Sequence, residues 1–250
     1  MCSFLLRKKK MDKRQIKKEK NSILFGVIPA RSGSKGIKNK NLRTVLSKPL
    51  IYYTIKEALS YKEIFKTIVT TDSLEIADLA KKYGAEVPFI RPKKLAKDNT
   101  SMLEVLKHAL LKCEQIYSQK IDGIVLFDPT SPLREKTEIK QMINVFLKKK
   151  PDLVIAVSKC KRNPYFNMVK INKMGYAQLV LKGNYSQRQD APAIFDITNN
   201  CWTFSRKAIL KGLRIPRRTI PYEINSPYVD IDKEVDLKFF ELFLKSGEKA

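Results

Sequence analysis

The sequence predicts an α/β protein built on a Rossmann-like, mostly parallel sheet with helices on both faces. Two observations carry this prediction: short apolar runs alternate with amphipathic segments over the first 160 residues, and polar segments follow the apolar runs. A chain of 250 residues with 43% hydrophobic content can also build one sizeable core. We therefore expect a single main domain over residues 21–250.

The expected elements alternate in chain order. Apolar or β-branched runs predict strands at residues 23–28, 66–70, 86–90, 123–127 and 153–157. Helical spacing predicts helices at residues 50–60, 74–83, 101–117 and 136–149. Asp72-Ser73 is placed to cap the second helix, and Ser101 followed by Glu104 resembles a capping box for the third. Parallel strands joined by such helices form a sheet that is covered on both faces.

The alternation stops between about residues 160 and 197. Short β-like runs and turns fill this segment, so we expect a small β-rich insertion that forms an arm over the active site or a partner subunit. After this insertion, strand and helix patterns resume, with expected strands at 200–204 and 214–220 and a last helix near 234–244.

The chain is strongly basic, with a formal net charge of +25. Residues 1–20 carry nine Lys or Arg against two Asp or Glu, which is typical of a disordered basic tail. The remaining lysines are scattered, as on a solvated surface, so we do not expect a nucleic-acid interface. No run approaches the roughly 18 apolar residues of a membrane span, so we expect a cytoplasmic protein with no membrane partner.

Cysteine and histidine usage excludes several kinds of site. The cysteines, Cys2, Cys113, Cys160 and Cys201, are far apart with no Cys-x-x-Cys pair, so we expect free thiols rather than a zinc site or disulfides. The single histidine, His108, lies off the apolar stripe of its helix and is expected at the surface. One such histidine argues against zinc sites with several imidazoles and against Ser-His-Asp catalysis.

A loop rich in Gly, Ser and basic residues follows the first expected strand, and it reads Arg31-Ser32-Gly33-Ser34-Lys35-Gly36. Glycines let the backbone approach a ligand closely, loop amides and hydroxyls donate hydrogen bonds, and cations neutralise phosphate charge. The spacing matches neither Gly-x-Gly-x-x-Gly nor the Walker A pattern. We therefore expect a nucleotide that is held by another arrangement.

Three further strand ends carry polar segments. They are Thr70-Thr71-Asp72-Ser73, Arg91-Pro92 and the run from Asp128 to Arg134. Ligands of open α/β sheets bind beyond the carboxyl ends of the strands. We therefore expect these segments to meet the phosphate-binding loop at one edge of the sheet.

Two carboxylates, Asp230 and Asp232, flank Ile231 near the end of the chain. In an extended segment, residues i and i+2 point to the same side, and paired carboxylates suit Mg²⁺ together with substrate phosphates. Taken alone, the pair is explained at least as well by Asp232 capping the last helix and Asp230 pairing with a lysine. Beside a phosphate-binding loop we favour the metal site. A cationic loop, an Mg²⁺ pair and no histidine base together indicate nucleotidyl transfer.

These residues resemble those of the CMP-sialic acid synthetase (acylneuraminate cytidylyltransferase) family over about residues 22–245. The matching elements, in chain order, are Ile28 to Asn41, Thr71-Asp72-Ser73, Arg91-Pro92, Pro129 to Arg134, Asn163 to Phe166, Arg188 to Pro192, and Asp230-Ile231-Asp232. The resemblance implies that CTP and a nonulosonic acid, a nine-carbon α-keto acid sugar, give a CMP-sugar and pyrophosphate. It also implies a homodimer that forms through the β-rich insertion and has shared sites.

The resemblance assigns roles in the nucleotide half of the site. Its nucleotide-binding positions correspond here to Arg31, Ser34, Lys35, Lys40, Asn41 and Arg91. Arg31 and Lys35 would stabilise the charge that develops on the phosphates, and Arg91 would read the cytosine. Asp230 and Asp232 would hold Mg²⁺, and Asp232 is one candidate for the group that deprotonates the sugar hydroxyl.

In the sugar-binding half of the site, one residue matches the family's pattern and two positions depart from it. Arg188 matches the arginine that grips the sugar carboxylate. Asp128 stands where many members have Gln, and this extra carboxylate would repel the substrate's own unless it is paired or bonds to sugar hydroxyls. Trp202 keeps an aromatic wall in a segment where members often read Asn-Gly-Ala-Ile-Tyr. The acceptor could therefore be N-acetylneuraminate, legionaminate or a related nonulosonate.

Two alternatives stay open at this point. Another acceptor, such as the eight-carbon acid Kdo or an ordinary sugar phosphate, would keep nucleotidyl transfer and change only the sugar. The Arg188 context favours a nonulosonate. A non-enzymatic binder of nucleic acid through the basic tail would show steeply salt-dependent binding that is lost when residues 1–20 are deleted.

Overall fold

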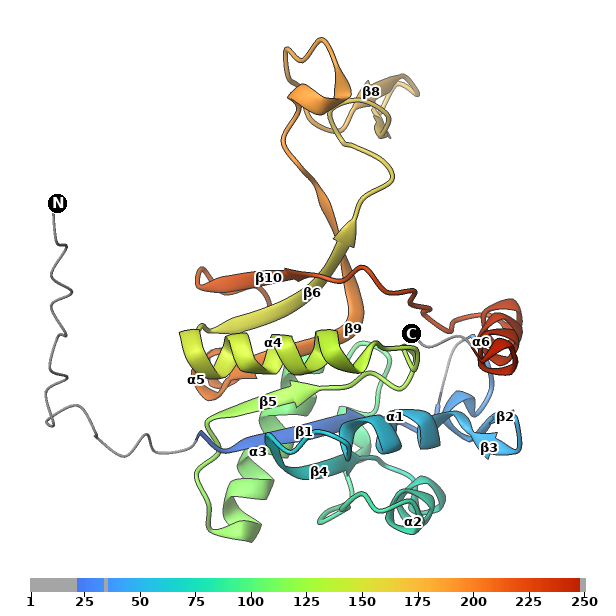
Figure 1. Cartoon of the computed structure of the whole chain (residues 1–250), viewed down its shortest axis with the longest axis vertical. Coiled ribbons are helices and arrows are strands. Elements are labelled where there is room, and N and C mark those ends of the chain that lie inside the picture. The colour runs from blue at the N-terminus through green and yellow to red at the C-terminus, as the bar shows by residue number, and fades with distance from the viewer. Residues whose placement is uncertain (1–21, 34–35, 248–250) are drawn as a thin grey trace, which may run out of the picture.

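A six-stranded sheet lies at the centre of the computed structural model, which describes residues 22–33 and 36–247 (Figure 1). In spatial order the strands are β10 (Thr219–Glu223), β6 (Leu153–Lys159), β9 (Phe195–Ser205), β5 (Gly123–Leu126), β1 (Leu24–Pro29) and β4 (Ile64–Thr70). β1 runs parallel to β4 and β5, β10 runs parallel to β6, and β9 runs antiparallel to both of its neighbours. The expected α/β fold with a mostly parallel sheet is confirmed.

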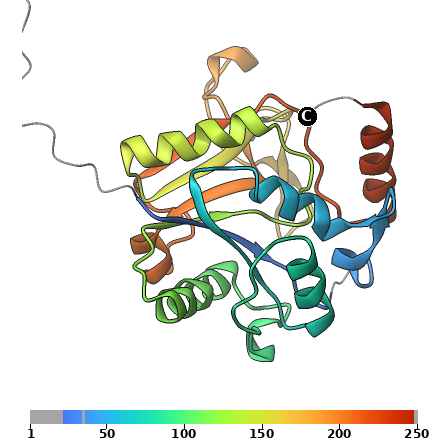
Figure 2. The same cartoon turned by 60° about the horizontal axis from the view of Figure 1, so that its bottom comes forward.

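Helices pack on both faces of this sheet (Figure 2). One face is covered by α1 (Leu50–Ala58), α2 (Leu74–Lys82) and α4 (Lys136–Lys149), and the other by α3 (Met102–Tyr117) and α5 (Arg206–Leu210). The alternation of side chains along β1 supplies both cores. Leu24 and Ile28 enter the first core, whereas Phe25 and Val27 enter the second.

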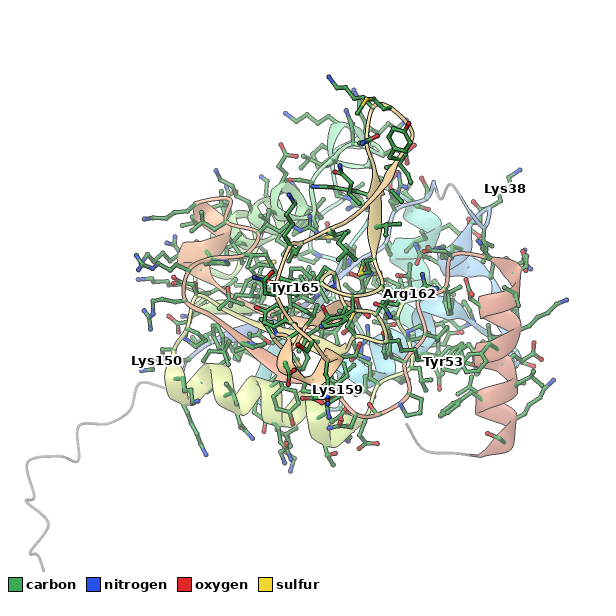
Figure 3. All side chains as sticks on the ribbon, turned by 90° about the horizontal axis from the view of Figure 1, so that it is seen from above. Lys38, Tyr53, Lys150, Lys159, Arg162 and Tyr165 are labelled. Atoms are coloured by element: carbon green, nitrogen blue, oxygen red, sulfur yellow. The ribbon has the colours of Figure 1, made fainter. Side chains whose placement is uncertain are left out.

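A third, smaller core links the end of the chain to the loop after β1. The last helix, α6 (Glu234–Ser246), shares this core with Ile37 of the loop and with Ile231. Tyr53 of α1 packs edge-on against Phe240 of α6, with ring centroids 5.1 Å apart. Figure 3 shows Tyr53 beside this last helix. This packing holds residues 230–232 beside the loop that follows the first strand.

The predicted helix starts are confirmed. The Ser101 hydroxyl accepts from the Glu104 amide at 3.3 Å, and the Glu104 carboxylate accepts from the Ser101 amide at 3.0 Å, which completes the capping box of α3. Ser73 caps α2 by accepting from the amide of Ile76 at 3.3 Å.

Two expected strands are wrong, and one hairpin was not anticipated. Residues 86–90 form only an isolated bridge from Glu86 to Ile68, since Pro88 has no amide hydrogen to continue a ladder. The last strand is β10 at Thr219–Glu223 rather than at 214–220, because Gly212, with φ at 65°, and Pro216 keep the preceding segment in turns. Sequence patterns did not predict the hairpin of β2 (Thr44–Val45) and β3 (Lys48–Pro49) or the short helices η2 (Lys40–Leu42), η3 (Lys93–Leu95), η4 (Arg188–Asp190) and α5 (Arg206–Leu210).

Residues 160–194 leave the sheet between β6 and β9 as a projecting arm (Figure 1). The arm carries the hairpin of β7 (Val169–Ile171) and β8 (Ala177–Leu179) and the short helix η4 (Arg188–Asp190). Several apolar side chains on it are exposed, from 38% for Met168 to 76% for Met174. The segment contains strands as expected, while its role in dimerisation and the domain boundaries stay predictions.

Other expectations concern cysteines, histidine, the membrane and the tail. Cys113 and Cys201 are free, and burial raises the pKa of each thiol to about 12, so both stay protonated at neutral pH. His108 is half-buried rather than at the surface, because its ring packs edge-on against Phe89.

Among the helices of the described residues, none is long and apolar enough to cross a membrane. The predicted tail over residues 1–20 lies outside the described residues.

Candidate active site

The carboxyl ends of β1 and β5 open onto one cleft, and the segment after β4 borders it through Asp72, which binds the loop after β1. A cavity of about 280 Å³ lies there. Six predicted site residues line it, namely Arg31, Lys40, Asn41, Arg91, Asp128 and Asp232. Two other expected phosphate-binding residues, Ser34 and Lys35, lie outside the described residues. The structure thus brings together most of the nucleotide positions and one member of the carboxylate pair.

Arg31 enters this cavity directly after β1. Its Nη1 atom donates to the Asp98 carboxylate and, at 3.4 Å, to the carbonyl of Ala96. The Asn41 side chain donates to the Arg31 carbonyl at 3.0 Å and so fixes the backbone at this point. Sequence reasoning missed Asp98, since no local pattern marks a residue 67 positions away as a partner. An anion that binds here would share Arg31 with a carboxylate.

Asp72, at the end of β4, holds the loop that follows Arg31. The Ser32 amide donates to Asp72 Oδ1 at 3.0 Å, and the Ser32 hydroxyl donates to Oδ2 at 2.7 Å. Burial acts to raise the pKa of Asp72, but the bonds from Ser32 and the charge of Arg91 outweigh it, so this pKa lies below its ordinary value. The loop is therefore tied to the neighbouring strand by a charged acceptor.

Arg91 presents buried donors to the cavity. Its guanidinium is 3% exposed and lies 3.8 Å from Asp72, and burial lowers the pKa of Arg91 although Asp72 opposes this effect. The Nε and Nη2 atoms have no hydrogen-bond partner within residues 22–33 and 36–247. Buried donors without partners are costly, so these atoms suit a ligand that supplies acceptors.

Lys40 connects the loop to the segment that carries the carboxylate pair. Its Nζ atom donates to Asp232 Oδ1 at 2.9 Å and to the Ile231 carbonyl, and the side chain is only 8% exposed. The Ile231 amide in turn donates to the Thr130 carbonyl at 2.7 Å. Gly36 lies tightly against the same segment, because a Cβ atom at this position would stand 2.2 Å from the Asp232 carbonyl oxygen. These contacts fix where Asp232 meets the cavity.

Asp230 lies deeper than Asp232 and among other carboxylates. Burial and the charges of Asp128 and Asp232 raise the pKa of Asp230, although a bond from the Ser131 hydroxyl and the charge of Arg134 act in the opposite direction. A divalent cation would relieve this repulsion. In the part of the chain that the structure describes, no group of three or more His, Cys, Asp or Glu side chains could hold a metal ion. The repulsion at Asp230 is compatible with Mg²⁺, which takes one or two carboxylates and completes its shell with water and phosphate, and the metal site itself stays a prediction.

Asp128 stands at the junction of this cavity with a second one. Its Oδ1 atom accepts from the Thr130 amide at 3.0 Å and from the Thr130 hydroxyl at 2.9 Å. Arg134, which is 6% exposed, donates to the backbone carbonyls of Asp128 and Asn200, both at 2.6 Å. The carboxylate at this position is thus hydrogen-bonded by Thr130, whereas Arg134 reaches the backbone carbonyl of Asp128 and not its carboxylate.

Replacement of Arg134 by Met is expected to lower the free energy of unfolding by about 2–5 kcal/mol. The change leaves two buried carbonyls without their charged donor. Urea denaturation of both proteins measures the difference. The control is Arg43→Met, which breaks a half-exposed ion pair with Glu234 and should cost less than about 1 kcal/mol. Equal losses in the two variants would contradict the structural role of Arg134.

The second cavity, of about 730 Å³, adjoins the first and shares Met102 and Asp128 with it. Trp202 lines this larger cavity, and its Nε1 atom donates to the Thr198 carbonyl at 2.8 Å, while its role as an aromatic wall for the sugar stays a prediction. Arg188, the third expected sugar-binding residue, belongs to η4 in the orange part of the arm, away from the sheet (Figure 1). Nothing is described of its side chain, and its role stays a prediction.

Known proteins are similar to this chain in sequence and in fold. A family model described as Cytidylyltransferase matches residues 25–237. The chain is 33% identical to the post-translational flagellin modification protein B of Campylobacter coli, over 90% of this chain and 96% of that protein. It is 35% identical to the CMP-N,N'-diacetyllegionaminic acid synthase of Campylobacter jejuni, over 87% of this chain and 93% of that protein.

The fold is also similar to that of a solved CMP-2-keto-3-deoxy-manno-octonic acid synthetase complexed with CTP. The TM-score is 0.67, and the match covers 91% of this chain and 100% of that chain at 14% identity. At so low an identity the likeness bears on the fold alone. The span matched by the family model includes every described residue that lines the smaller cavity.

Proposed function

The chain belongs to the cytidylyltransferase family, and on that premise we propose that it joins CTP to a nonulosonic acid and releases pyrophosphate. One observation carries the proposal: cationic side chains near the loop after β1 share a single cavity with Asp232 of the carboxylate pair. The similarity to a synthase named for N,N'-diacetyllegionaminic acid supports a nonulosonic acceptor.

The proposed reaction is an in-line displacement at the α-phosphorus of CTP. The anomeric hydroxyl of the acid attacks, a new P–O bond forms, and the P–O bond to pyrophosphate breaks. Arg31 and Lys35 stabilise the charge that gathers on the departing phosphates. Asp232, whose side chain is 78% exposed, takes the hydroxyl proton.

We assign the remaining nucleotide contacts from the geometry of the cleft and from the resemblance. The Nε and Nη2 atoms of Arg91 have no hydrogen-bond partner among the described residues, although Nη2 lies 3.8 Å from Asp72, and both suit the acceptor atoms of cytosine. Ser34, Lys40 and Asn41 complete the triphosphate and ribose contacts. The sugar contacts are Asp128 and Trp202, with Arg188 gripping the carboxylate of the acid.

We also assign a Mg²⁺ ion to Asp230 and Asp232. When bound, the ion supplies charge neutralisation on the phosphates. Support comes from the raised pKa of Asp230 among neighbouring carboxylates and from the preference of Mg²⁺ for few carboxylates beside phosphate. Lys40 balances one of these carboxylates at 2.9 Å.

A homodimer that forms through the arm is part of the proposal, because Arg188 lies on the arm and would then serve a partner's cavity. The exposed apolar side chains of β7 and β8 support an interface there. The cytoplasm is the expected location.

Charged substitutions on the arm are expected to weaken self-association at least tenfold. Ile171→Glu places a charge on a side chain that is 66% exposed, so it should disturb an interface and leave the folded chain intact. Light scattering during size-exclusion chromatography measures the oligomeric state. Leu242→Glu on α6, where Leu242 is 65% exposed, is the matched control. A monomeric wild type, or identical behaviour of both variants, would contradict an interface on the arm.

The test of the proposed function is pyrophosphate release from CTP and Mg²⁺ with a panel of acceptors. The panel holds several nonulosonic acids, the eight-carbon acid Kdo and a hexose 1-phosphate. Turnover with a nonulosonic acid is the expected result. A higher rate with Kdo than with any nonulosonic acid would mean that Kdo, the alternative acceptor, is the substrate. No pyrophosphate release with any acid would reject cytidylyl transfer.

A further inference from the structure

Asp98 holds a guanidinium that the proposed reaction needs for phosphate. The Asp98 carboxylate accepts from Nη1 of Arg31, and the same Nη1 atom donates to the Ala96 carbonyl at 3.4 Å. Arg31 lines the smaller cavity, and its side chain is 32% exposed. Carboxylates and phosphates are both oxygen anions that accept charged hydrogen bonds from a guanidinium. Asp98 therefore occupies Arg31 in the way that a phosphate oxygen would.

Two carboxylates balance the two guanidiniums of the cleft, and they differ in how firmly they are held. Arg31 pairs with Asp98, while Nη2 of the neighbouring Arg91 lies 3.8 Å from Asp72. Burial lowers the pKa of Arg91 and the charge of Arg31 adds to this effect, so the two cations lie close enough to repel each other. Asp72 is 11% exposed and accepts two bonds from Ser32, whereas Asp98 is 46% exposed. Asp98 is therefore the carboxylate that can return to water at the lower cost.

The segment that carries Asp98, residues 92–100, is anchored at both ends and lightly held between them. At one end the Arg91 amide donates at 2.7 Å to the backbone directly after β4, and at the other end the capping box of Ser101 starts α3. Each residue of this described segment is half-buried or exposed. Its own backbone bonds are those of short turns, such as the 3.0 Å bond from the Ala96 amide to the Lys93 carbonyl. A segment with so few buried contacts can shift at a low cost in free energy.

These contacts give Asp98 a role that the proposed reaction leaves open. We propose that Asp98 competes with substrate phosphate for Arg31: it holds the guanidinium in the free protein, gives it up when a triphosphate binds, and takes it back as pyrophosphate leaves. Without such a competitor the cations would hold pyrophosphate more tightly, and tight binding of a product does not speed its formation. The inference rests on the proposed cytidylyl transfer, since it takes Arg31 as a phosphate-binding residue.

The test measures the affinity for inorganic pyrophosphate by isothermal titration calorimetry in the presence of Mg²⁺. Asp98→Asn frees Arg31 from its charged partner, so the Kd of pyrophosphate should fall about three- to fivefold, as expected for a partly exposed ion pair. Asp98→Ala removes the acceptor altogether and should give at least the same gain. A carboxylate that only aligned Arg31 for the ligand would change the affinity in the opposite direction, because its loss would weaken binding.

Asp78→Asn is the matched control, because it changes the net charge by the same amount. Asp78 lies on α2, is 78% exposed and pairs with Lys81 at 3.7 Å, outside the residues that line the cleft. Water and salt screen such an exposed charge, so the Kd of pyrophosphate should stay within about twofold of the wild type. Steady-state kinetics give a second readout: the KM for CTP should fall in Asp98→Asn and stay the same in Asp78→Asn.

Two results would overturn the competition and leave the proposed function standing. One is an unchanged or raised Kd of pyrophosphate in both Asp98 variants. The other is an equal fall in Kd for Asp98→Asn and Asp78→Asn, since a general gain of positive charge would then explain the effect. If neither the wild type nor any variant binds pyrophosphate or CTP, the cleft does not hold phosphates, and the proposed function fails together with the inference.

Discussion

Asp232→Asn is expected to lower the kcat of pyrophosphate release by about a thousandfold, which corresponds to about 4 kcal/mol in the activation barrier. The substitution removes a charge that the proposed reaction uses both to hold Mg²⁺ and to take a proton. The side chain is 78% exposed and an amide oxygen can still accept from Lys40, so the protein should remain folded, with a thermal midpoint lowered only by the weaker pairing of the buried Lys40. Steady-state kinetics at saturating CTP and acceptor measure the effect.

Two further variants sharpen this prediction. Asp230→Asn should also reduce kcat strongly, because it removes the second proposed ligand while an amide oxygen can still accept from Ser131. Glu234→Gln is the control, since it removes a half-exposed carboxylate two residues beyond Asp232 that pairs with Arg43. Activity within tenfold of the wild type in both aspartate variants would reject the assigned metal and base roles.

The sequence predicts the frame of the site because the frame depends on local patterns. Apolar alternation placed β1, β4 and β5, and the polar segments after them were therefore expected at one edge of the sheet. The carboxylate pair can also be recognised from the sequence as a candidate metal site, since Asp230 and Asp232 are the kind of ligands that Mg²⁺ prefers. These predictions need no knowledge of how distant segments pack.

Contacts between distant segments were beyond the reach of sequence patterns. Lys40 meets Asp232 across 192 positions, and Arg31 meets Asp98 across 67. Both pairs depend on how α6 and the segment after Arg91 pack against the loop, and no spacing rule encodes that packing. The turn at Leu46 and Ser47 was missed for a similar reason, because both residues have positive φ without being glycine.

Gly36→Ala is expected to reduce kcat/KM about a hundredfold while the protein remains folded. The new Cβ atom would stand 2.2 Å from the Asp232 carbonyl oxygen, a distance that van der Waals contact forbids, so one of the two segments has to move. The segment that moves is either the phosphate-binding loop or the one carrying Asp232. In both cases the cations and the carboxylate that share the cavity lose their alignment, and small displacements of reacting groups reduce rates steeply.

Gly33→Ala gives the matched control for this steric effect. A Cβ atom at Gly33 meets nothing within 4 Å among the described residues, so the same added methyl group in the same loop should reduce kcat/KM much less. Kinetics of pyrophosphate release for both variants, with thermal unfolding to verify folding, make the comparison. Similar losses would mean that the loop tolerates no methyl group at all. Only a selective loss at Gly36 supports the view that close packing of this loop on the Asp232 segment aligns the two halves of the site.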